Sequence, residues 1–278
     1  MYHHHHRNSM EVVVRQYLVE ADGRKLLLQD DDTARTFIDD LARNDDLHAT
    51  GNEHPGDNQL YRGMRSDSYV TQLAEVLAGW KETSRHPLLE LPDVPMVGVT
   101  EDKSSLLRVL GIPLEMVVHV DSVASMDSFI TAIGGARGIL TLLGVRCTVG
   151  SAVVCPPTRA QCLEAFNRRQ SSDSKSSILT IGARQWTKHV QRSLNGWWGV
   201  NKGSEAAKNA VAECMIVQLL DSTVWKNIHG LPNGPVVFEI RQHEGYGARW
   251  SIQGGKDVHF RGFVEPYFEN GHDVGWMH

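Results

Sequence analysis

The stretch Val236-Val-Phe-Glu-Ile-Arg-Gln-His-Glu-Gly-Tyr-Gly-Ala-Arg-Trp250 decides the predicted fold, together with His259-Phe-Arg-Gly-Phe-Val-Glu-Pro266 downstream. Apolar and polar residues alternate on both sides of Gly245-Tyr-Gly247, which is the pattern of two strands joined by a tight turn. The downstream segment predicts a further strand. We therefore predict a sheet near the end of the chain. Its dense Arg, Glu, His, Tyr and Trp side chains indicate a pocket or an interface.

Length and composition set broad limits. The 278 residues suffice for one large domain or two smaller ones. A net charge of -5 lacks the basic footprint of a protein that binds duplex DNA. The four cysteines form no C-x-x-C pair, which favours buried, reduced thiols and an intracellular, cytoplasmic location. No apolar run is long enough to span a bilayer, so we expect no membrane partner.

The chain is predicted to have three regions. Residues 1–10 contain four consecutive histidines before a second methionine, and we expect them to be a tag or a disordered leader. The serine-rich stretch 170–177 predicts a linker or an exposed loop. We place a boundary there, between a mixed helix and strand region (11–175) and a sheet-and-helix unit (176–278). The alternative is one continuous domain.

Periodicity and capping signals predict the individual elements. Strands are predicted at 11–19, 96–99 and 115–120, with two more between 138 and 154. Helices are predicted at 32–43, 68–80, 125–133, 158–168 and 204–220, the last with a buried stripe of Ala207, Ala210, Val211, Cys214 and Val217. The fold class is therefore α/β of the α+β type. It has a mainly antiparallel C-terminal sheet with packed helices, preceded by a mixed helix and strand half.

Three cations are spaced to share one face of a helix. Arg184, Lys188 and Arg192 stand at i, i+4 and i+8, with His189 beside them. Guanidinium groups suit phosphate and carboxylate, and no acid in 184–199 neutralises these charges. The stripe is either an anion-binding site or a solvated helix face with incidental charge.

A second cluster is predicted on the sheet. Alternation places Glu239, Arg241 and His243 on one side of a strand. Antiparallel pairing would add Arg249, Arg261 and Glu265. The cluster fits two interpretations: a site for a polar ligand with acid–base chemistry, or a salt-bridge lattice that satisfies itself.

The candidate site residues follow from these clusters and the nearby aromatic residues. The proton-transfer candidates are His189, Glu239 and Glu244. The ligand-binding candidates are Arg184, Lys188, Arg192, Trp198, Arg241, Tyr246, Arg249, Arg261 and Glu265. We assign no metal ligand, because His259, His272, Asp273 and His278 are irregularly spaced. Trp197-Trp198 and Trp250 fit either base stacking or core packing.

The C-terminal region also resembles a known family. The similarity rests on Gly182-Ala-Arg184, Lys188-His189, Trp197-Trp198-Gly199, Gly203-Ser-Glu205, Glu239-Ile-Arg241, Gly245-Tyr-Gly-Ala-Arg-Trp250, Arg261-Gly-Phe263, Glu265-Pro266, Gly271-His272, Gly275-Trp276 and His278. Over roughly 176–278 the sequence is similar to a widespread family of proteins that has no established activity, a domain of unknown function. The resemblance implies one contiguous unit with a shared site and carries no mechanism.

Together these features predict the binding of a small anionic molecule, such as a phosphorylated one, by an enzyme or a binding protein. A first alternative is a non-catalytic subunit of a larger protein or ribonucleoprotein assembly, with the loop 44–65 as an attachment arm. A second is a metal-dependent hydrolase that uses the C-terminal histidines. The sequence leaves the reaction class and any cofactor open.

Overall fold

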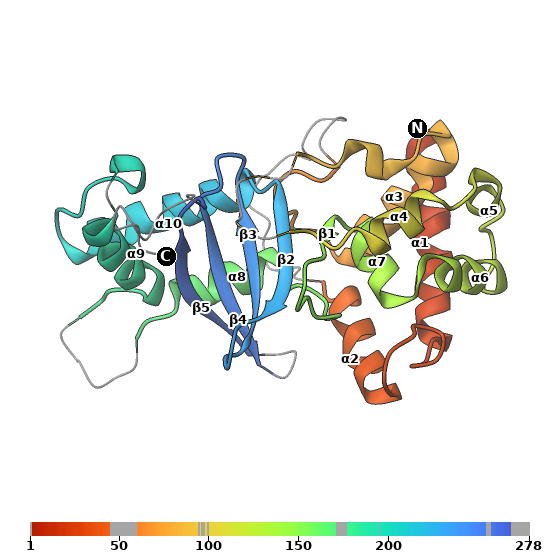
Figure 1. Cartoon of the computed structure of the whole chain (residues 1–278), viewed down its shortest axis with the longest axis horizontal. Helices are drawn as coiled ribbons and strands as arrows, with labels where there is room; N and C mark the ends of the chain where they lie inside the picture. The colour runs from red at the N-terminus through yellow and green to blue at the C-terminus, as the bar shows by residue number, and fades with distance from the viewer. Residues whose placement is uncertain are drawn as a thin grey trace. The chain divides into compact units, whose positions relative to one another are not determined.

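The computed structural model describes residues 2–44, 60–93, 95, 98, 100–170, 177–193, 195–253 and 257–267. The chain divides into two compact units (Figure 1). The first comprises Met1–Tyr61, Ser66–Pro92 and Thr100–Pro156, and the second comprises Arg62–Arg65, Asp93–Val99 and Pro157–His278. The boundary that we expected near residue 175 falls inside the second unit.

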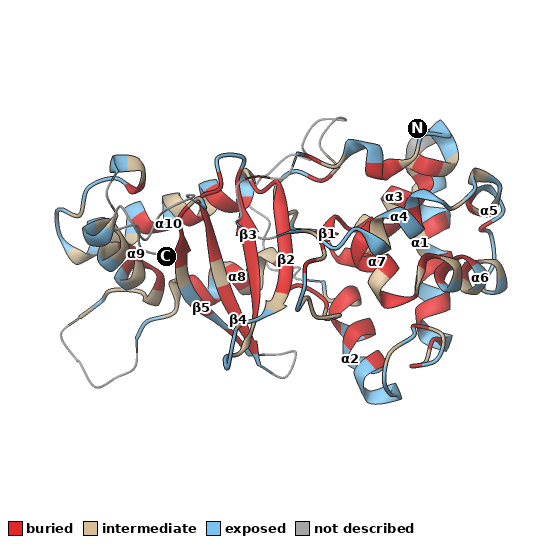
Figure 2. Cartoon of the chain, in the orientation of Figure 1, coloured by how far each residue is buried: buried red, intermediate tan, exposed pale blue. Residues whose placement is uncertain are grey.

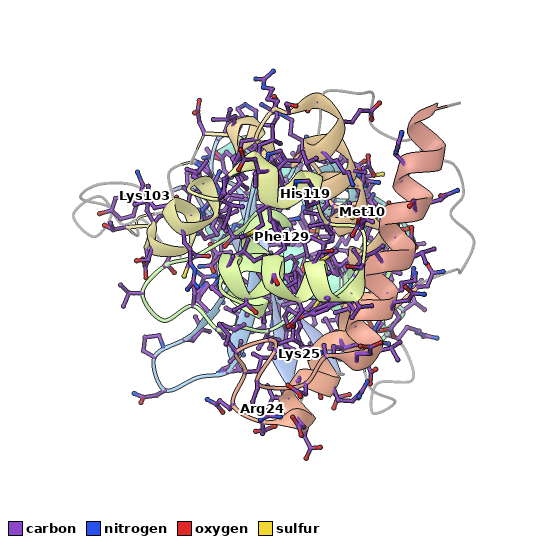
Figure 3. The ribbon with its side chains drawn as sticks, turned by 90° about the vertical axis from the view of Figure 1, so that its right-hand side faces the viewer. Met10, Arg24, Lys25, Lys103, His119 and Phe129 are labelled. Atoms are coloured by element: carbon purple, nitrogen blue, oxygen red, sulfur yellow. The ribbon has the colours of Figure 1, made fainter. Side chains whose placement is uncertain are left out.

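The first unit is mainly helical. Its elements are α1 (Tyr2–Glu20), α2 (Asp31–Ala42), α3 (Tyr69–Thr83), η1 (Pro87–Glu90), α4 (Ser104–Leu110), α5 (Leu114–Val118), α6 (Val123–Ile133), α7 (Ala136–Leu142) and the short strand β1 (Val145–Arg146). α1 packs against α3 and α6. Met10 on α1 and Phe129 on α6 are both buried in this helical core (Figure 3).

The strand predicted at 11–19 was wrong, because these residues belong to α1. Val13, Val14, Tyr17 and Leu18 are buried. Their spacing of three to four residues is that of one helix face, and packing of this face overrides the β-propensity of the valines. The helix includes residues 2–10, which we had expected to be a tag or a disordered leader, and buries Met10.

Two further strand predictions in this unit were wrong. Residues 114–118 form α5, whose Val117 is buried. Between 138 and 154 the chain forms α7 and only the two-residue strand β1. Gly134 and Gly135 have φ values of 96° and 66°, which end α6 and let α7 start directly after it. The strand predicted at 96–99 lies largely outside the described residues.

The second unit combines helices with a sheet. Its elements are α8 (Arg159–Asn167), α9 (Ile181–Arg192), η2 (Gly196–Trp198), α10 (Glu205–Asp221), β2 (Trp225–Gly230), β3 (Val236–Arg241), β4 (Gly247–Gln253) and β5 (Asp257–Val264). Strands β2 to β5 lie in chain order, and each pairs antiparallel with the next. This confirms the predicted α+β class and the mainly antiparallel sheet.

One face of the sheet packs on the helices. α8 and α9 contact β5, and α10 contacts β3 and β4 (Figure 1). The indole nitrogen of Trp250 donates to the Cys162 carbonyl on α8 at 3.1 Å, and the Phe166 and Phe260 rings meet edge to face at 4.7 Å. Most residues of β3 and β4 are buried (Figure 2).

The predicted helices at 32–43, 68–80, 125–133, 158–168 and 204–220 are confirmed as α2, α3, α6, α8 and α10. The predicted capping box of α8 forms between Thr158 and Gln161. The buried stripe of α10 was wrong: Ala207, Ala210, Val211 and Cys214 are exposed and Val217 is half-buried. The residues that α10 buries are Ala212, Ile216, Leu219 and Leu220. Among the described residues, no helix is long and apolar enough to cross a bilayer.

The packing of α9 on α8 gives a testable prediction. A Cβ on Gly182 of α9 would lie 2.4 Å from the buried Phe166 ring of α8. Gly182→Ala should therefore lower the free energy of unfolding by about 1–3 kcal/mol. Gly196→Ala is the matched control, because a Cβ there meets nothing within 4 Å and should change stability by less than about 0.5 kcal/mol. Urea unfolding followed by tryptophan fluorescence measures the stability of both variants. Equal free energies of unfolding for Gly182→Ala and Gly196→Ala would contradict the prediction.

Candidate functional site

The second face of the sheet carries polar side chains. The register aligns Asn227 of β2, Glu239 of β3 and Arg249 of β4 across adjacent strands. Because side chains alternate along a strand, His229 and Arg241 project on this same side. We call these five residues the polar face. The apolar residues of the same strands, such as Phe238 and Trp250, point to the helices.

Glu239 is the centre of the polar face, and its side chain is only 3% exposed. One carboxylate oxygen accepts from Nε of Arg241 at 2.6 Å. The other oxygen accepts from Nε of Arg249 at 2.7 Å and pairs with Nε2 of His229 at 2.9 Å. Three strands therefore each supply one partner, and the predicted Glu–Arg cluster forms across β3 and β4.

The surroundings of Glu239 keep it ionised. Burial alone would raise the pKa of its carboxyl group, because burial disfavours the charged form. The hydrogen bond with His229 and the charges of Arg241 and Arg249 outweigh burial and lower the pKa to about 2. At neutral pH Glu239 is therefore a poor proton acceptor, and it is suited to orienting its neighbours.

Arg241 links the polar face to a second carboxylate. Its Nη1 donates to the backbone carbonyls of Gly245 at 2.8 Å and Glu265 at 2.6 Å. The Glu265 carboxylate pairs with Nε2 of His189 at 2.9 Å and accepts from the indole nitrogen of Trp198 at 2.7 Å. Burial would raise the pKa of Glu265, but these hydrogen bonds lower it. One buried arginine thus connects two His–Glu pairs of the second unit, His229 with Glu239 and His189 with Glu265.

Aromatic rings border the second His–Glu pair. Trp197 and Tyr246 stack face to face with centroids 3.9 Å apart and an interplanar angle of 10°. Asn195 holds both residues, because its amide nitrogen donates to the Tyr246 hydroxyl at 2.9 Å and its amide oxygen accepts from the Trp197 backbone at 3.1 Å. Trp198 is fully buried, so its side chain has no surface to offer a ligand.

The structure brings seven of the candidate residues into this connected group: His189, Trp198, Glu239, Arg241, Tyr246, Arg249 and Glu265. Five others lie apart from it. Arg184, Lys188 and Arg192 are exposed on α9, and the helix meets the condition under which these three cations share one face. Arg261 is exposed on β5, and Glu244 lies in the β3–β4 turn and accepts from Gln242. His243 is in the same turn and is 73% exposed, so it does not join Glu239.

Sequence reasoning missed His229 and Asn195. The signal for His229 was present, since Trp225-Lys-Asn-Ile-His-Gly230 precedes the turn Leu231-Pro-Asn-Gly-Pro235 and the next strand. Asn233 adopts a left-handed φ of 51° in this turn, a conformation that Asn adopts more readily than most residues. Asn195 gave no such signal, because its role depends on Tyr246, which is distant in the sequence.

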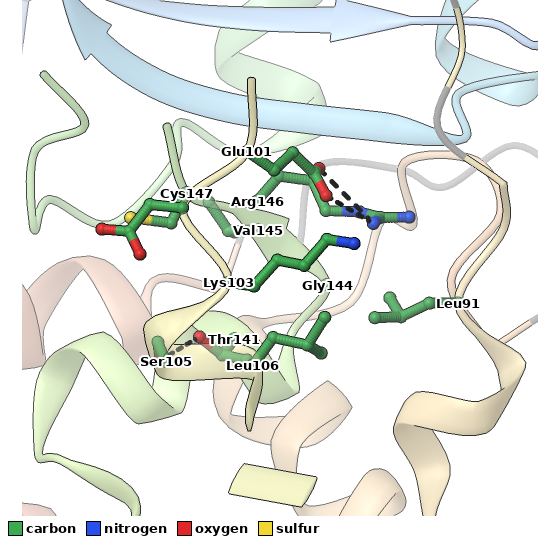
Figure 4. Close-up of a pocket in the computed structure, with 11 residues that line it drawn as sticks. Leu91, Glu101, Lys103, Ser105, Leu106, Thr141, Gly144, Val145, Arg146 and Cys147 are labelled. Atoms are coloured by element: carbon green, nitrogen blue, oxygen red, sulfur yellow. Dashed lines mark hydrogen bonds and ion pairs between the residues drawn. The ribbon is translucent and has the colours of Figure 1, made fainter. Parts of the chain in front are cut away.

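The first unit has a small polar cavity lined by residues from 91 to 147 (Figure 4). In it, Nη1 of Arg146 lies 3.4 Å from Glu101, and Nη2 of Arg146 donates to the Pro92 carbonyl at 2.5 Å. The cavity holds about 20 Å³, which is room for roughly one water molecule. Arg146 and Glu101 pair with each other and the cavity is too small for a ligand larger than water, so we do not regard it as a ligand site.

No group of three or more His, Cys, Asp or Glu residues in the described part of the chain is placed to hold a metal ion. His259 is exposed on β5 and contacts Arg168 at 3.4 Å. His272, Asp273 and His278, on which the metal alternative depended, lie outside the described residues.

Comparison with known proteins relates part of the chain to a protein family. Residues 168–265, which lie wholly within the second unit, match the model of the CdiA C-terminal tRNase toxin domain. No curated protein and no solved structure matches the chain. The matched segment contains α9, α10, the sheet and both His–Glu pairs.

This match corrects the expectations from sequence. The family it names is a tRNase toxin family with a stated activity, so the expected resemblance to a domain of unknown function was wrong. The expected small anionic ligand was also wrong, as were the alternatives of a non-catalytic assembly subunit and a metal-dependent hydrolase, because the matched domain is a nuclease of tRNA. Among the expected partners, RNA agrees with the match.

The lowered pKa of Glu239 predicts a pH-dependent contribution to stability. The carboxylate stabilises the fold above its unfolded pKa of 4.5, and this contribution is lost as the pH falls toward about 2. The shift corresponds to about 3 kcal/mol. Glu239→Gln should thus be less stable than wild type by about that amount at pH 7, and the difference should shrink between pH 5 and pH 2. Urea unfolding of both proteins between pH 2 and pH 7 measures the difference in their free energies of unfolding. A difference that does not change with pH would refute the lowered pKa of Glu239.

Proposed function

We propose that the second unit is a ribonuclease toxin domain that cleaves tRNA. The observation that carries this proposal is the match of residues 168–265 to the CdiA C-terminal tRNase toxin domain. The polar face supports it, because buried charges that orient a histidine are a common arrangement for acid–base catalysis. Since tRNA is the substrate, such a toxin acts inside a target cell.

RNA offers a cleavage route that needs only proton transfer and charge stabilisation. A base takes the proton of the ribose 2′-hydroxyl, and the 2′ oxygen then attacks the neighbouring phosphorus. The bond from phosphorus to the 5′ oxygen breaks, and that oxygen takes up a proton from solvent. The products are a 2′,3′-cyclic phosphate and a free 5′-hydroxyl. Negative charge grows on the phosphoryl oxygens in the transition state, so a nearby cation accelerates the reaction.

We assign His229 as the base. Its Nε2 is held by Glu239, which fixes the ring and leaves Nδ1 as the nitrogen that can accept a proton. The His229 side chain is 18% exposed, so substrate can reach it. Glu239 is then a positioning residue, as an ionised carboxylate is for the histidine of a catalytic triad.

The two arginines have different roles in this proposal. Arg249 is 29% exposed and uses its Nε for Glu239, so its terminal nitrogens can contact a phosphate. Arg241 is buried, and its Nε and Nη1 bond Glu239 and two backbone carbonyls, so it positions Glu239. The pair of His189 and Glu265 lies beyond Arg241 and supports that end of the network.

The cationic stripe of α9 suits the RNA backbone. Arg184, Lys188 and Arg192 are exposed, and His189 between them bonds Glu265 of the network. Contacts from lysine and arginine to phosphates supply much of the affinity for nucleic acids. We therefore propose that this stripe holds tRNA phosphates outside the reacting nucleotides.

Replacement of His229 tests the assigned base. His229→Gln keeps a hydrogen-bond donor for Glu239 but removes the nitrogen that accepts the proton. Cleavage of tRNA by the full chain should fall by about 100-fold or more. The assay follows radiolabelled tRNA on a denaturing gel and tests the products for a cyclic phosphate end.

The matched control is His243→Ala, which changes an exposed histidine outside the polar face and should leave the rate near that of wild type. Wild-type cleavage by a folded His229→Gln protein would contradict the assignment. Failure of the wild-type chain to cleave any tRNA would contradict the proposed function itself.

Neutralising the α9 stripe tests the backbone contacts. Lys188→Gln/Arg192→Gln should lower kcat/KM for tRNA and make its logarithm fall less steeply with the logarithm of salt concentration. The slope should change by about 1.5, because each neutralised phosphate contributes about 0.7–0.9. Cleavage of a dinucleotide should be unchanged, because we propose that the stripe contacts phosphates outside the reacting nucleotides.

The control Arg24→Gln/Lys103→Gln removes the same charge from exposed residues of the first unit (Figure 3). An equal loss in both double variants would indicate a general charge effect and contradict a specific role for α9.

A further inference from the structure

We propose that Trp197 stacks on a nucleobase of the RNA beside the cleaved phosphodiester. This inference rests on the proposed function and adds a binding residue to the same site. Aromatic side chains commonly hold the bases of single-stranded or splayed RNA by stacking. Four observations on Trp197 support the assignment.

The first observation is the geometry of the rings. Trp197 and Tyr246 stack almost parallel, with an interplanar angle of 10°. The neighbouring pairs are packed edge to face, at 77° for Trp197 with Trp198 and 87° for Trp198 with Tyr246. Tyr246 is 8% exposed and Trp197 is half-buried, so Trp197 is the outer ring of the stack.

The second observation concerns the indole nitrogen. The indole nitrogens of Trp186, Trp198 and Trp250 each donate a hydrogen bond within the second unit. In the described part of the chain the indole nitrogen of Trp197 donates none. The indole N–H of a core tryptophan normally donates a hydrogen bond within the protein. The indole N–H of Trp197 can therefore donate to an acceptor atom on RNA.

The third observation is the way the stack is held. Asn195 binds the Trp197 backbone and the Tyr246 hydroxyl at the same time. Gly199, with a φ of 90°, ends the short helix η2 that carries Trp197. The ring is therefore held in place before substrate arrives, which reduces the entropic cost of binding.

The fourth observation is the position of the stack. Tyr246 follows Gly245, whose carbonyl accepts from Arg241 at 2.8 Å. Arg241 in turn holds Glu239, the partner of the proposed base His229. Gly245, Arg241 and Glu239 thus connect the stack to His229 by hydrogen bonds within the second unit.

The proposal is tested by removing the Trp197 ring from the protein and a nucleobase from the RNA, each separately and both together. The cleavage site of the full-length wild-type chain is first mapped on tRNA, and a short RNA with that site is made in three forms. One form is intact, and the others lack the base on the 5′ or the 3′ side of the cleaved bond. Wild type, Trp197→Ala and Trp197→Phe are then compared by kcat/KM on each form.

We expect Trp197→Ala to lower kcat/KM on the intact RNA by about 10- to 100-fold. On one of the two abasic RNAs the loss should be less than about twofold, because the partner of the ring is already absent. Trp197→Phe should recover part of the activity, since it keeps an aromatic face.

Two outcomes would overturn the inference. Unchanged cleavage by Trp197→Ala would show that the ring does not contact the substrate. An equal loss on all three RNAs would show that the ring acts only through the fold, and thermal unfolding of the variant would reveal the same defect. Both outcomes leave the proposed function standing. Absence of cleavage by wild type would overturn the proposed function first and this inference with it.

Discussion

The second unit depends on a single buried carboxylate. Glu239 would be costly to bury alone, and it is tolerated because two arginines and a histidine meet it at hydrogen-bonding distance. The same contacts fix the orientation of the His229 ring and of the Arg249 guanidinium group. One electrostatic constraint therefore both stabilises the sheet and arranges the groups that we assign to RNA cleavage.

The sequence predicted the sheet and the caps well, because these signals are local. Alternation around the Gly-Tyr-Gly turn located β3 and β4, and it also predicted that Glu239 and Arg241 share a face. The capping box at Thr158 located the start of α8. Where the prediction failed, tertiary packing decided the outcome. The valines of α1 have high β-propensity, yet their helical spacing lets them fill the core of the first unit.

The candidate site was only partly predictable for a related reason. Residues along one strand can be assigned to a face from alternation, but partners from other elements need the fold. His229 joins Glu239 only through the register of β2 on β3, and Asn195 reaches Tyr246 only because η2 packs near the β3–β4 turn. The activity itself was not predictable from these residues, since the same charges suit many anions. The proposal of tRNA cleavage comes from the family match of residues 168–265.

The three side chains that bond Glu239 come from three different strands. This arrangement makes the sheet sensitive to an error in strand register. A slip of β4 by one residue against β3 would turn Arg249 toward the helices and place Ala248 or Trp250 opposite Glu239. The carboxylate would then lose a cation while remaining buried, and the misaligned sheet would be both less stable and without its phosphate contact. The charge of Glu239 therefore favours the correct alignment of β4 on β3, and a chain with the slipped alignment would lack the arrangement that we assign to RNA cleavage.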